Sequence, residues 1–205
     1  MNKWTIKTGL KTIKMQTTSH ILMIRPVDFK FNEQTAGNNK FQQASEQSEV
    51  QQQALQEFDG FVKILRDNGV EVTVIDDTLE PATPDSIFPN NWVSFHEDGA
   101  VFLYPMFSEN RRLERRNEIL ETLESNFEIT HVHDLSFYEN GNIFLEGTGS
   151  MVLDRANKIA YACRSIRTND KLLVEWADKM GYRLGVFNAK DESGMDIYHT
   201  NVMMA

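Results

Sequence analysis

The chain repeats one pattern of secondary structure, and this repeat limits the fold more than any other feature of the sequence. From Val93 onward the order is two short apolar runs joined by a turn, an amphipathic helix and another apolar run. The pattern restarts 58 residues later at Met151, and 51 residues after that at Val202. A ββαβ unit cannot bury both faces of its small sheet alone, so each repeat must pack on its neighbours. The sequence therefore predicts an α/β fold built from packed repeats.

Turn and capping residues define the predicted elements of the second and third units. Asp98-Gly99 between two apolar runs is typical of a hairpin, and Gly181 is placed to end a helix that Thr168 caps. The predicted strands cover residues 92–95, 100–104, 129–132, 151–153, 159–162 and 182–187. The predicted helices cover residues 168–181 and residues 108–126, the latter burying Leu113, Ile119, Leu120 and Leu123.

The two ends of the chain give less complete units. The N-terminal part predicts a strand at residues 21–24, a helix at 45–68 ended by Gly69, and a strand at 70–75. Residues 197–204 are predicted to form the opening strand of a fourth unit. Because a chain that ends inside a repeat leaves an unpaired strand edge, we expect either a partner or a longer natural polypeptide. The sequence leaves open whether the protein forms a homo-oligomer.

Charge and composition exclude several classes of function. The net charge of −9 argues against nucleic-acid binding, and no apolar run approaches the roughly 18 residues that span a bilayer. Cys163 is the single cysteine, so no internal disulfide can form, which is typical of a cytoplasmic protein. Residues 1–14 hold four lysines and no acidic residue and are interpreted as a basic extension before one domain over residues 15–205. Small-molecule chemistry fits this composition best.

Polar segments interrupt the repeats at equivalent places, and in a radial repeat such places converge on the axis. Glu146 ends an apolar strand and is followed by Gly147 and Gly149, which permit a ligand to approach the backbone closely. A carboxylate in such a pocket can bind a carbon centre rich in N–H groups. His199 could act as a general acid or base. Taken singly, each residue is more often structural: a surface glutamate at a turn, or a hydrogen-bonded core histidine.

Three segments carry a resemblance to a known group of enzymes. PDSIFPNNWVSF, LEGTGSMVLD with the later SIRTN, and YHTNVMM occur in the order and approximate spacing of the signature segments of the guanidino-group-modifying superfamily. This superfamily includes arginine deiminases, dimethylarginine dimethylaminohydrolases and amidinotransferases, and the chain is most similar to its citrulline-hydrolase-like branch. The resemblance covers residues 15–205 and implies a pentein-type five-bladed α/β propeller. This chain would hold three blades and the first strand of a fourth, and it would be C-terminally incomplete.

The resemblance also implies roles for individual residues. Glu146 would grip the terminal nitrogens of the substrate, and His199 would be the general acid and base. Arg111 or Arg112 would reach the carboxylate of a small amino-acid substrate, either citrulline or an arginine-like compound. No metal and no cofactor takes part. Further substrate contacts are implied for Asp85, Asn91, Arg167 and Asn201.

The implied reaction also needs a nucleophile. A cysteine thiolate attacks the central carbon of the substrate, histidine protonates the departing amine, and water releases the covalent adduct. In the superfamily this cysteine lies near the C-terminus of the complete fold. Cys163 lies in the middle of a predicted strand, at a position that the superfamily does not use, and is interpreted as a small buried hydrophobic residue. We therefore expect the chain to lack its nucleophile and to be inactive alone.

Two departures from the arginine deiminase pattern suggest the substrate. Arginine deiminases have aspartate where this chain has Asn91 and Asn201. Two carboxylates suit a cationic guanidinium, whereas asparagine offers a neutral donor and acceptor that fit a ureido group. We therefore predict hydrolysis of citrulline to ornithine, ammonia and carbon dioxide. Two alternatives stay open: an amidinotransferase, and a non-catalytic pentein module that binds a small ligand or a protein.

Two other polar clusters carry weaker signals. His131 and His133 have a spacing compatible with a metal, but two histidines without a third ligand more often form a polar strand face. Residues 111–116 hold four arginines mixed with glutamate. They are predicted to form a solvated, ion-paired helix face.

Overall fold

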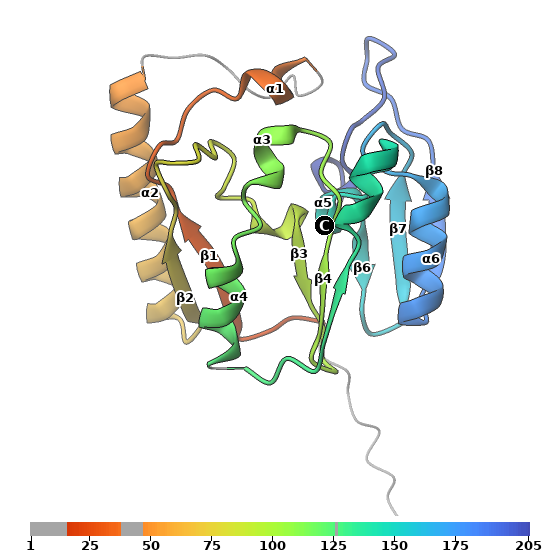
Figure 1. Ribbon diagram of the computed structural model, residues 1–205, viewed down its shortest axis with the longest axis horizontal. Coiled ribbons are helices and arrows are strands. Elements are labelled where there is room, and N and C mark those ends of the chain that lie inside the picture. Colours follow the sequence, from red (N-terminus) through yellow and green to blue (C-terminus); the bar gives the residue numbers. More distant parts are fainter. Residues whose placement is uncertain (1–15, 38–46, 126) are drawn as a thin grey trace, which may run out of the picture.

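The protein consists of three α/β units that lie side by side (Figure 1). The computed structural model describes residues 16–37, 47–125 and 127–205, so the predicted extension over residues 1–14 lies outside the described residues. Each unit has its own small sheet: β1-β2, β3-β4-β5 and β6-β7-β8. The predicted repeat of short mixed sheets is confirmed in the second and third units, because each combines an antiparallel and a parallel strand pair.

The first unit pairs two parallel strands and has a long helix on its outer side (Figure 1). The helix predicted over residues 45–68 is confirmed where the structure describes it. Along the described residues the unit has no antiparallel strand equivalent to those of the other two units. Its elements are β1 (His20–Arg25), α1 (Glu33–Ala36), α2 (Gln47–Asp67) and β2 (Glu71–Asp76).

The second unit forms around the predicted hairpin. Gly99 has φ +79, and a Cβ at this position would lie 2.7 Å from the carbonyl oxygen of Glu128, so glycine is required at the turn. Val93 pairs with Leu103 across the antiparallel ladder, as the hairpin predicts. The elements are η1 (Pro89–Asn91), β3 (Val93–Phe95), β4 (Ala100–Leu103), α3 (Glu109–Arg112), α4 (Asn117–Glu124) and β5 (His131–Asp134).

The prediction of one continuous helix over residues 108–126 was wrong. The chain forms α3 and α4, with a break between them. At the break Arg111 and Glu114 turn into the protein and pair at 2.8 Å, while Leu113 is 48% exposed instead of buried. Ile119 and Leu123 are buried as predicted. The prediction of a solvated charged face also fails here, because Arg111 and Glu114 are almost fully buried.

The third unit follows the same order, with a short helical turn before its hairpin. Its second helix is capped by Asn169, one residue after the predicted Thr168, because the Asn169 side chain accepts the N–H groups of Lys171 and Leu172. Gly181 ends that helix with φ +67, as predicted. The elements are η2 (Ser136–Gly141), α5 (Gly147–Ser150), β6 (Val152–Asp154), β7 (Ile159–Cys163), α6 (Asp170–Met180) and β8 (Arg183–Phe187).

The strand predicted over residues 197–204 is a helical turn instead, η3 (Thr200–Val202). The Thr200 hydroxyl is buried and bonds to the backbone of α5 and β7, which holds this segment as a turn. The turn precedes the final residues of the chain in the same way that η1 precedes β3 and α5 precedes β6. Of these three turns, α5 packs on both η1 and η3 in the middle of the molecule, where the C-terminus lies (Figure 1).

Two apolar clusters hold the units together. The first joins Ile24 of β1 to Trp92, Val101, Ile119 and Leu123 of the second unit. The second joins β4 to the third unit, and its buried members include Phe102, Tyr104, Leu145, Leu153, Leu173 and Trp176. Each large side chain that is removed from water here contributes about 1.5–3 kcal/mol to folding. None of the helices in the described part of the chain is long and apolar enough to cross a membrane.

Candidate active site

A buried carboxylate and a buried imidazole meet where α5 and η3 pack together. Oε2 of Glu146 lies 2.6 Å from Nε2 of His199 and 3.2 Å from Nη1 of Arg167. Oε1 of the same carboxylate accepts the backbone N–H of Phe107 at 2.9 Å. Glu146 is fully inaccessible to solvent, and His199 and Arg167 are almost so. Both carboxylate oxygens are therefore engaged by donors, as a buried charge requires.

The local structure explains how two distant residues come together. Glu146 and His199 each stand directly before a single helical turn, α5 and η3 respectively. Gly149 allows these turns to pack closely, because a Cβ there would lie 2.9 Å from Cε1 and Nδ1 of His199 and 2.4 Å from Nδ2 of Asn91. Gly147 has φ +43 and packs against the carbonyl oxygen of Asn90. The two glycines therefore bring three segments into contact.

The surroundings set the charge of the pair. Burial by itself would raise the pKa of Glu146, but the hydrogen bond from His199 and the nearby charges of Arg167 and Arg111 outweigh it and lower the pKa to about 2. Burial lowers the pKa of His199, against the opposing effect of Glu146. At neutral pH the glutamate is therefore ionised and the histidine neutral. Nε2–H then donates to Glu146, and Nδ1 keeps its lone pair.

A cleft of about 940 Å³ opens over this pair, between the segment that carries α1 and the start of α3. The side chains of Asp85, Asn91, Arg111, Arg167, His199 and Asn201, all singled out in the sequence, line it. Asn201 is exposed, so it belongs to the rim of the cleft. Lining residues that the sequence did not single out include Phe31, Asn32, Thr35, Asn110 and Tyr198.

Arg111 is anchored by residues of its own unit. Its guanidinium donates to both carboxylate oxygens of Glu114 at 2.8 and 3.0 Å and to Oδ1 of Asn91 at 2.7 Å. It also donates to the carbonyl oxygens of Asp85 and Phe88. Because Oδ1 of Asn91 accepts from Arg111, the amide is oriented with its Nδ2 toward Gly149. Asn91 therefore presents a hydrogen-bond donor to the region of the Glu146–His199 pair.

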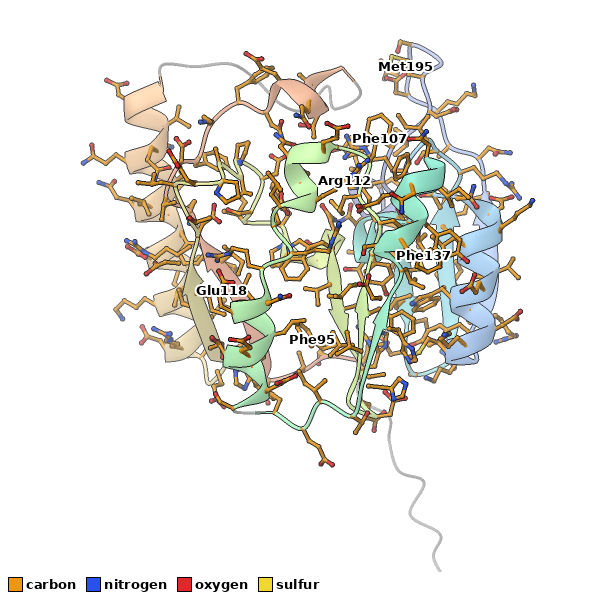
Figure 2. All side chains as sticks on the ribbon, in the orientation of Figure 1. Phe95, Phe107, Arg112, Glu118, Phe137 and Met195 are labelled. Atoms are coloured by element: carbon orange, nitrogen blue, oxygen red, sulfur yellow. The ribbon has the colours of Figure 1, made fainter. Side chains whose placement is uncertain are left out.

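Arg112 occupies a different place. Its Nε and Nη2 donate to the carbonyl oxygens of Met106 and Phe107, and its guanidinium lies 5.9 Å from the centre of the Phe144 ring. Arg112 does not line the cleft, and Figure 2 shows it close to Phe107 beside α3. Between the two arginines, the structure thus directs Arg111 and not Arg112 toward the cleft.

Asp85 is held by a small amide network at the mouth of the cleft. Its Oδ2 accepts from Nδ2 of Asn32 at 2.7 Å, and Oδ1 of Asn32 accepts from Nδ2 of Asn110 at 2.8 Å. In addition, Oε1 of Gln34 accepts the backbone N–H of Asn110 at 2.9 Å. The network ties α1 to α3 across the opening.

Two groups at the site were not foreseen. The Phe107 N–H belongs to the backbone, which has no signature in the sequence. The Tyr198 ring lies 4.8 Å from the Arg167 guanidinium, a cation–π contact that its place beside His199 could have suggested. Cys163 is fully buried, with its sulfur 3.3 Å from the carbonyl oxygen of Ile197, and it does not line the cleft.

Comparison with known proteins identifies the fold. The model of the eukaryotic N,N dimethylarginine dimethylhydrolase family matches residues 25–205. The N-terminal domain of ArgZ, a cyanobacterial arginine dihydrolase bound to product, is similar with 19% identity and a TM-score of 0.64, over 88% of this chain and 60% of that one. A dimethylarginine dimethylaminohydrolase from Pseudomonas aeruginosa, complexed with citrulline, is similar with 19% identity and a TM-score of 0.57, over 88% and 62%. No curated protein matches the chain.

These similarities confirm the predicted fold class, a pentein-type α/β propeller of repeated units. At 19% sequence identity, the solved structures support the assignment of the fold and nothing more. The chain spans about 60% of the length of these structures.

Proposed function

Since the chain belongs to the eukaryotic N,N-dimethylarginine dimethylhydrolase family, within the guanidino-group-modifying superfamily, we propose that it carries the acid–base part of a carbon–nitrogen hydrolase. Its substrates are guanidino or ureido amino acids. The observation that carries the proposal is the buried 2.6 Å contact between Glu146 and His199 beneath the cleft. A carboxylate that orients a neutral imidazole is the arrangement that general acid–base catalysis needs.

In this mechanism Glu146 fixes the histidine tautomer. Its negative charge holds the Nε2 proton, so Nδ1 of His199 is the atom that exchanges protons with the reacting groups. Nδ1 of His199 takes the proton of the attacking thiol, gives it to the departing amine, and then removes a proton from the water that releases the adduct. Arg167 and the Phe107 N–H keep Glu146 ionised through this cycle. Asn91 donates from Nδ2 to the ureido oxygen of the substrate.

The nucleophile comes from outside this sequence. Cys163 is the single cysteine of the chain, and its sulfur is buried against Ile197 and Thr200 instead of facing the cleft. The family resemblance implies a thiolate that attacks the central carbon. We therefore propose that activity requires residues in addition to the 205 of this sequence.

The charges of the site favour a neutral ureido group, and citrulline is the substrate that we propose first. Glu146 is already neutralised by Arg167, and Glu114 by Arg111. Asn91 adds a neutral amide where a second carboxylate would attract a cation. The citrulline bound to the Pseudomonas aeruginosa enzyme supports this choice. Ornithine, ammonia and carbon dioxide would be the products.

A methylated arginine is the second candidate, and two observations favour it. The family whose model matches this chain is named N,N dimethylarginine dimethylhydrolase. Asp85 lines the cleft with a carboxylate that lies 3.9 Å from Nε of Arg111, which leaves it able to receive a cationic guanidinium. Citrulline and dimethylarginine differ in the charge of the group that enters the site, so they can be separated by direct competition.

Binding and turnover test the proposal separately. Calorimetric titration of this chain with citrulline, arginine and dimethylarginine should give the tightest binding for citrulline. His199→Gln should weaken the binding, whereas the exposed His131→Gln serves as the matched control. Turnover is then measured as ammonia release by a protein that includes the nucleophile, with and without an acceptor amine that would reveal amidinotransfer. Absence of both binding and turnover would favour a module for another partner.

A further inference from the structure

Two buried hydroxyl groups lie behind the Glu146–His199 pair, and the proposed reaction does not use them. Ser150 ends α5 and Thr200 begins η3, and neither side chain has any solvent exposure. Neither residue lines the cleft. Buried hydroxyls need hydrogen-bond partners, so their partners show which parts of the backbone they connect.

Ser150 connects the residues that flank the carboxylate. Its Oγ accepts the backbone N–H of Glu146 at 3.0 Å and donates to the carbonyl oxygen of Arg167 at 2.8 Å. The Glu146 N–H also lies 3.3 Å from the same carbonyl oxygen. One hydroxyl thus ties the backbone that carries the carboxylate to the backbone that carries its cationic partner, 21 residues away.

Thr200 makes the equivalent connection for the histidine. Its Oγ1 accepts the backbone N–H of Cys163 at 2.8 Å and donates to the carbonyl oxygen of Ser150 at 2.6 Å. Among the residues that the structure describes, η3 otherwise makes backbone hydrogen bonds only within residues 199–204. The Thr200 hydroxyl is therefore the direct link from the turn behind His199 to both α5 and the end of β7.

We propose that Ser150 and Thr200 are positioning residues that set the separation and orientation of Glu146 and His199. The two residues of the pair are 53 positions apart, and each precedes a single helical turn with little stiffness of its own. The hydroxyls link these turns in series, from Arg167 through Ser150 to Thr200 and Cys163. Their effect on catalysis rests on the proposed function, whereas their effect on the geometry of the pair does not.

The tautomer of His199 provides a test that does not require activity. In the wild-type chain, imidazole ¹⁵N NMR should report a single neutral tautomer with the proton on Nε2, assigned with His199→Gln. Thr200→Ser keeps the hydroxyl and should keep this signature. Thr200→Val removes the hydroxyl at nearly constant shape, so both tautomers should become populated. Ser150→Ala should act in the same direction.

A matched control separates this effect from general loss of stability. Ser94 is also buried, and its Oγ bonds to Tyr104 and His96, away from the cleft. Ser94→Ala should lower stability yet leave the His199 tautomer unchanged. A folded Thr200→Val variant that retains the single tautomer would overturn the proposal. So would failure of both Thr200→Val and Ser150→Ala to fold, because the hydroxyls would then serve the fold as a whole.

Kinetics extend the test to the protein that includes the nucleophile. A misplacement of the histidine should lower kcat by about 10- to 100-fold in Thr200→Val, with KM changed less than about twofold. Thr200→Ser should restore most of kcat. If the wild-type protein proves inactive on every substrate while the NMR result holds, the proposed function fails and the positioning role stands. Equal kcat in Thr200→Val and wild type would refute the catalytic part.

Discussion

The backbone N–H of Phe107 donates to Oε1 of Glu146, which leaves Oε2 for His199 and Arg167. The loop that supplies this N–H is itself held in place by hydrogen bonds with two charged side chains. Glu139 accepts the N–H of Met106 at 2.8 Å, and Arg112 holds the carbonyl oxygens of Met106 and Phe107. A charge network outside the cleft thus determines one of the contacts of the buried carboxylate.

Removal of Glu139 should destabilise the protein more than removal of a surface glutamate. Arg115 pairs with Glu139 at 2.8 Å, and the carboxylate is mostly buried. Glu139→Ala leaves Arg115 and the Met106 N–H without this partner, at a cost of about 2–3 kcal/mol in the free energy of unfolding. Urea denaturation measures the change. The control Glu118→Ala removes an exposed carboxylate that lies 3.4 Å from Arg116, and it should cost less than about 0.5 kcal/mol.

Gly149→Ala should disrupt the site, whereas Gly60→Ala should be harmless. At Gly149 the new Cβ would lie 2.4 Å from Nδ2 of Asn91 and 2.9 Å from the His199 ring, so one of them must move. A loss of about 2 kcal/mol or more in stability and weaker citrulline binding are expected. At Gly60, within α2, nothing lies within 4 Å, and alanine should stabilise the helix by about 0.5–1 kcal/mol. Thermal unfolding measures the stability of both variants, and calorimetry measures their citrulline binding. Equal stability and equal binding in the two variants would contradict the close packing at Gly149.

Stability should fall as the pH is lowered from neutrality, in part because of His199. Its pKa in the folded protein lies below the ordinary value of 6.5, so below that pH the unfolded chain binds a proton that the folded chain does not. Stability is then lost at up to about 1.4 kcal/mol per pH unit. The Glu146 contribution, with a folded pKa of about 2 against the usual 4.5, is lost only between those two values.

Urea denaturation at pH 7, 6 and 5 checks this pH dependence. His199→Gln should flatten the decline below pH 6.5 relative to the wild type. The exposed His131→Gln, which lies outside the cleft, is the matched control. Parallel slopes for wild type and His199→Gln would show that the imidazole is not held neutral by burial.

Asn91→Asp should shift the preference of the site from neutral to cationic substrates. The new carboxylate would still accept from Nη1 of Arg111, and its second oxygen would replace the Nδ2 donor that now faces Gly149. The affinity ratio of citrulline to arginine should fall by about tenfold, which corresponds to about 1.4 kcal/mol. Asn201→Asp, at the exposed rim, should change the ratio much less. Competition calorimetry measures both, and a ratio that rises in Asn91→Asp would exclude the ureido argument.

Sequence reasoning succeeded where the signal is local. The hairpin at Asp98-Gly99 and the helix end at Gly181 depend on backbone angles that glycine adopts with little cost, so neighbouring residues suffice to predict them. The same holds for the amphipathic pattern of α2. Prediction failed at residues 108–126, because the helix breaks where Arg111 and Glu114 turn inward and pair, and Arg111 also bonds to Asn91. That contact joins residues 20 positions apart, beyond the range of any helical pattern.

In the candidate site, too, some features follow from the sequence and others only from the tertiary structure. The residue types, the order of the motifs and the repeat that makes the segments converge are properties of the sequence, and they were enough to single out Glu146 and His199. Tertiary structure alone decided that Arg111 and not Arg112 lines the cleft, that residues 197–204 form a turn, and that a backbone N–H completes the shell of Glu146. The physical reason is that burial and hydrogen bonding depend on which distant segments share a space, and no local pattern encodes that arrangement.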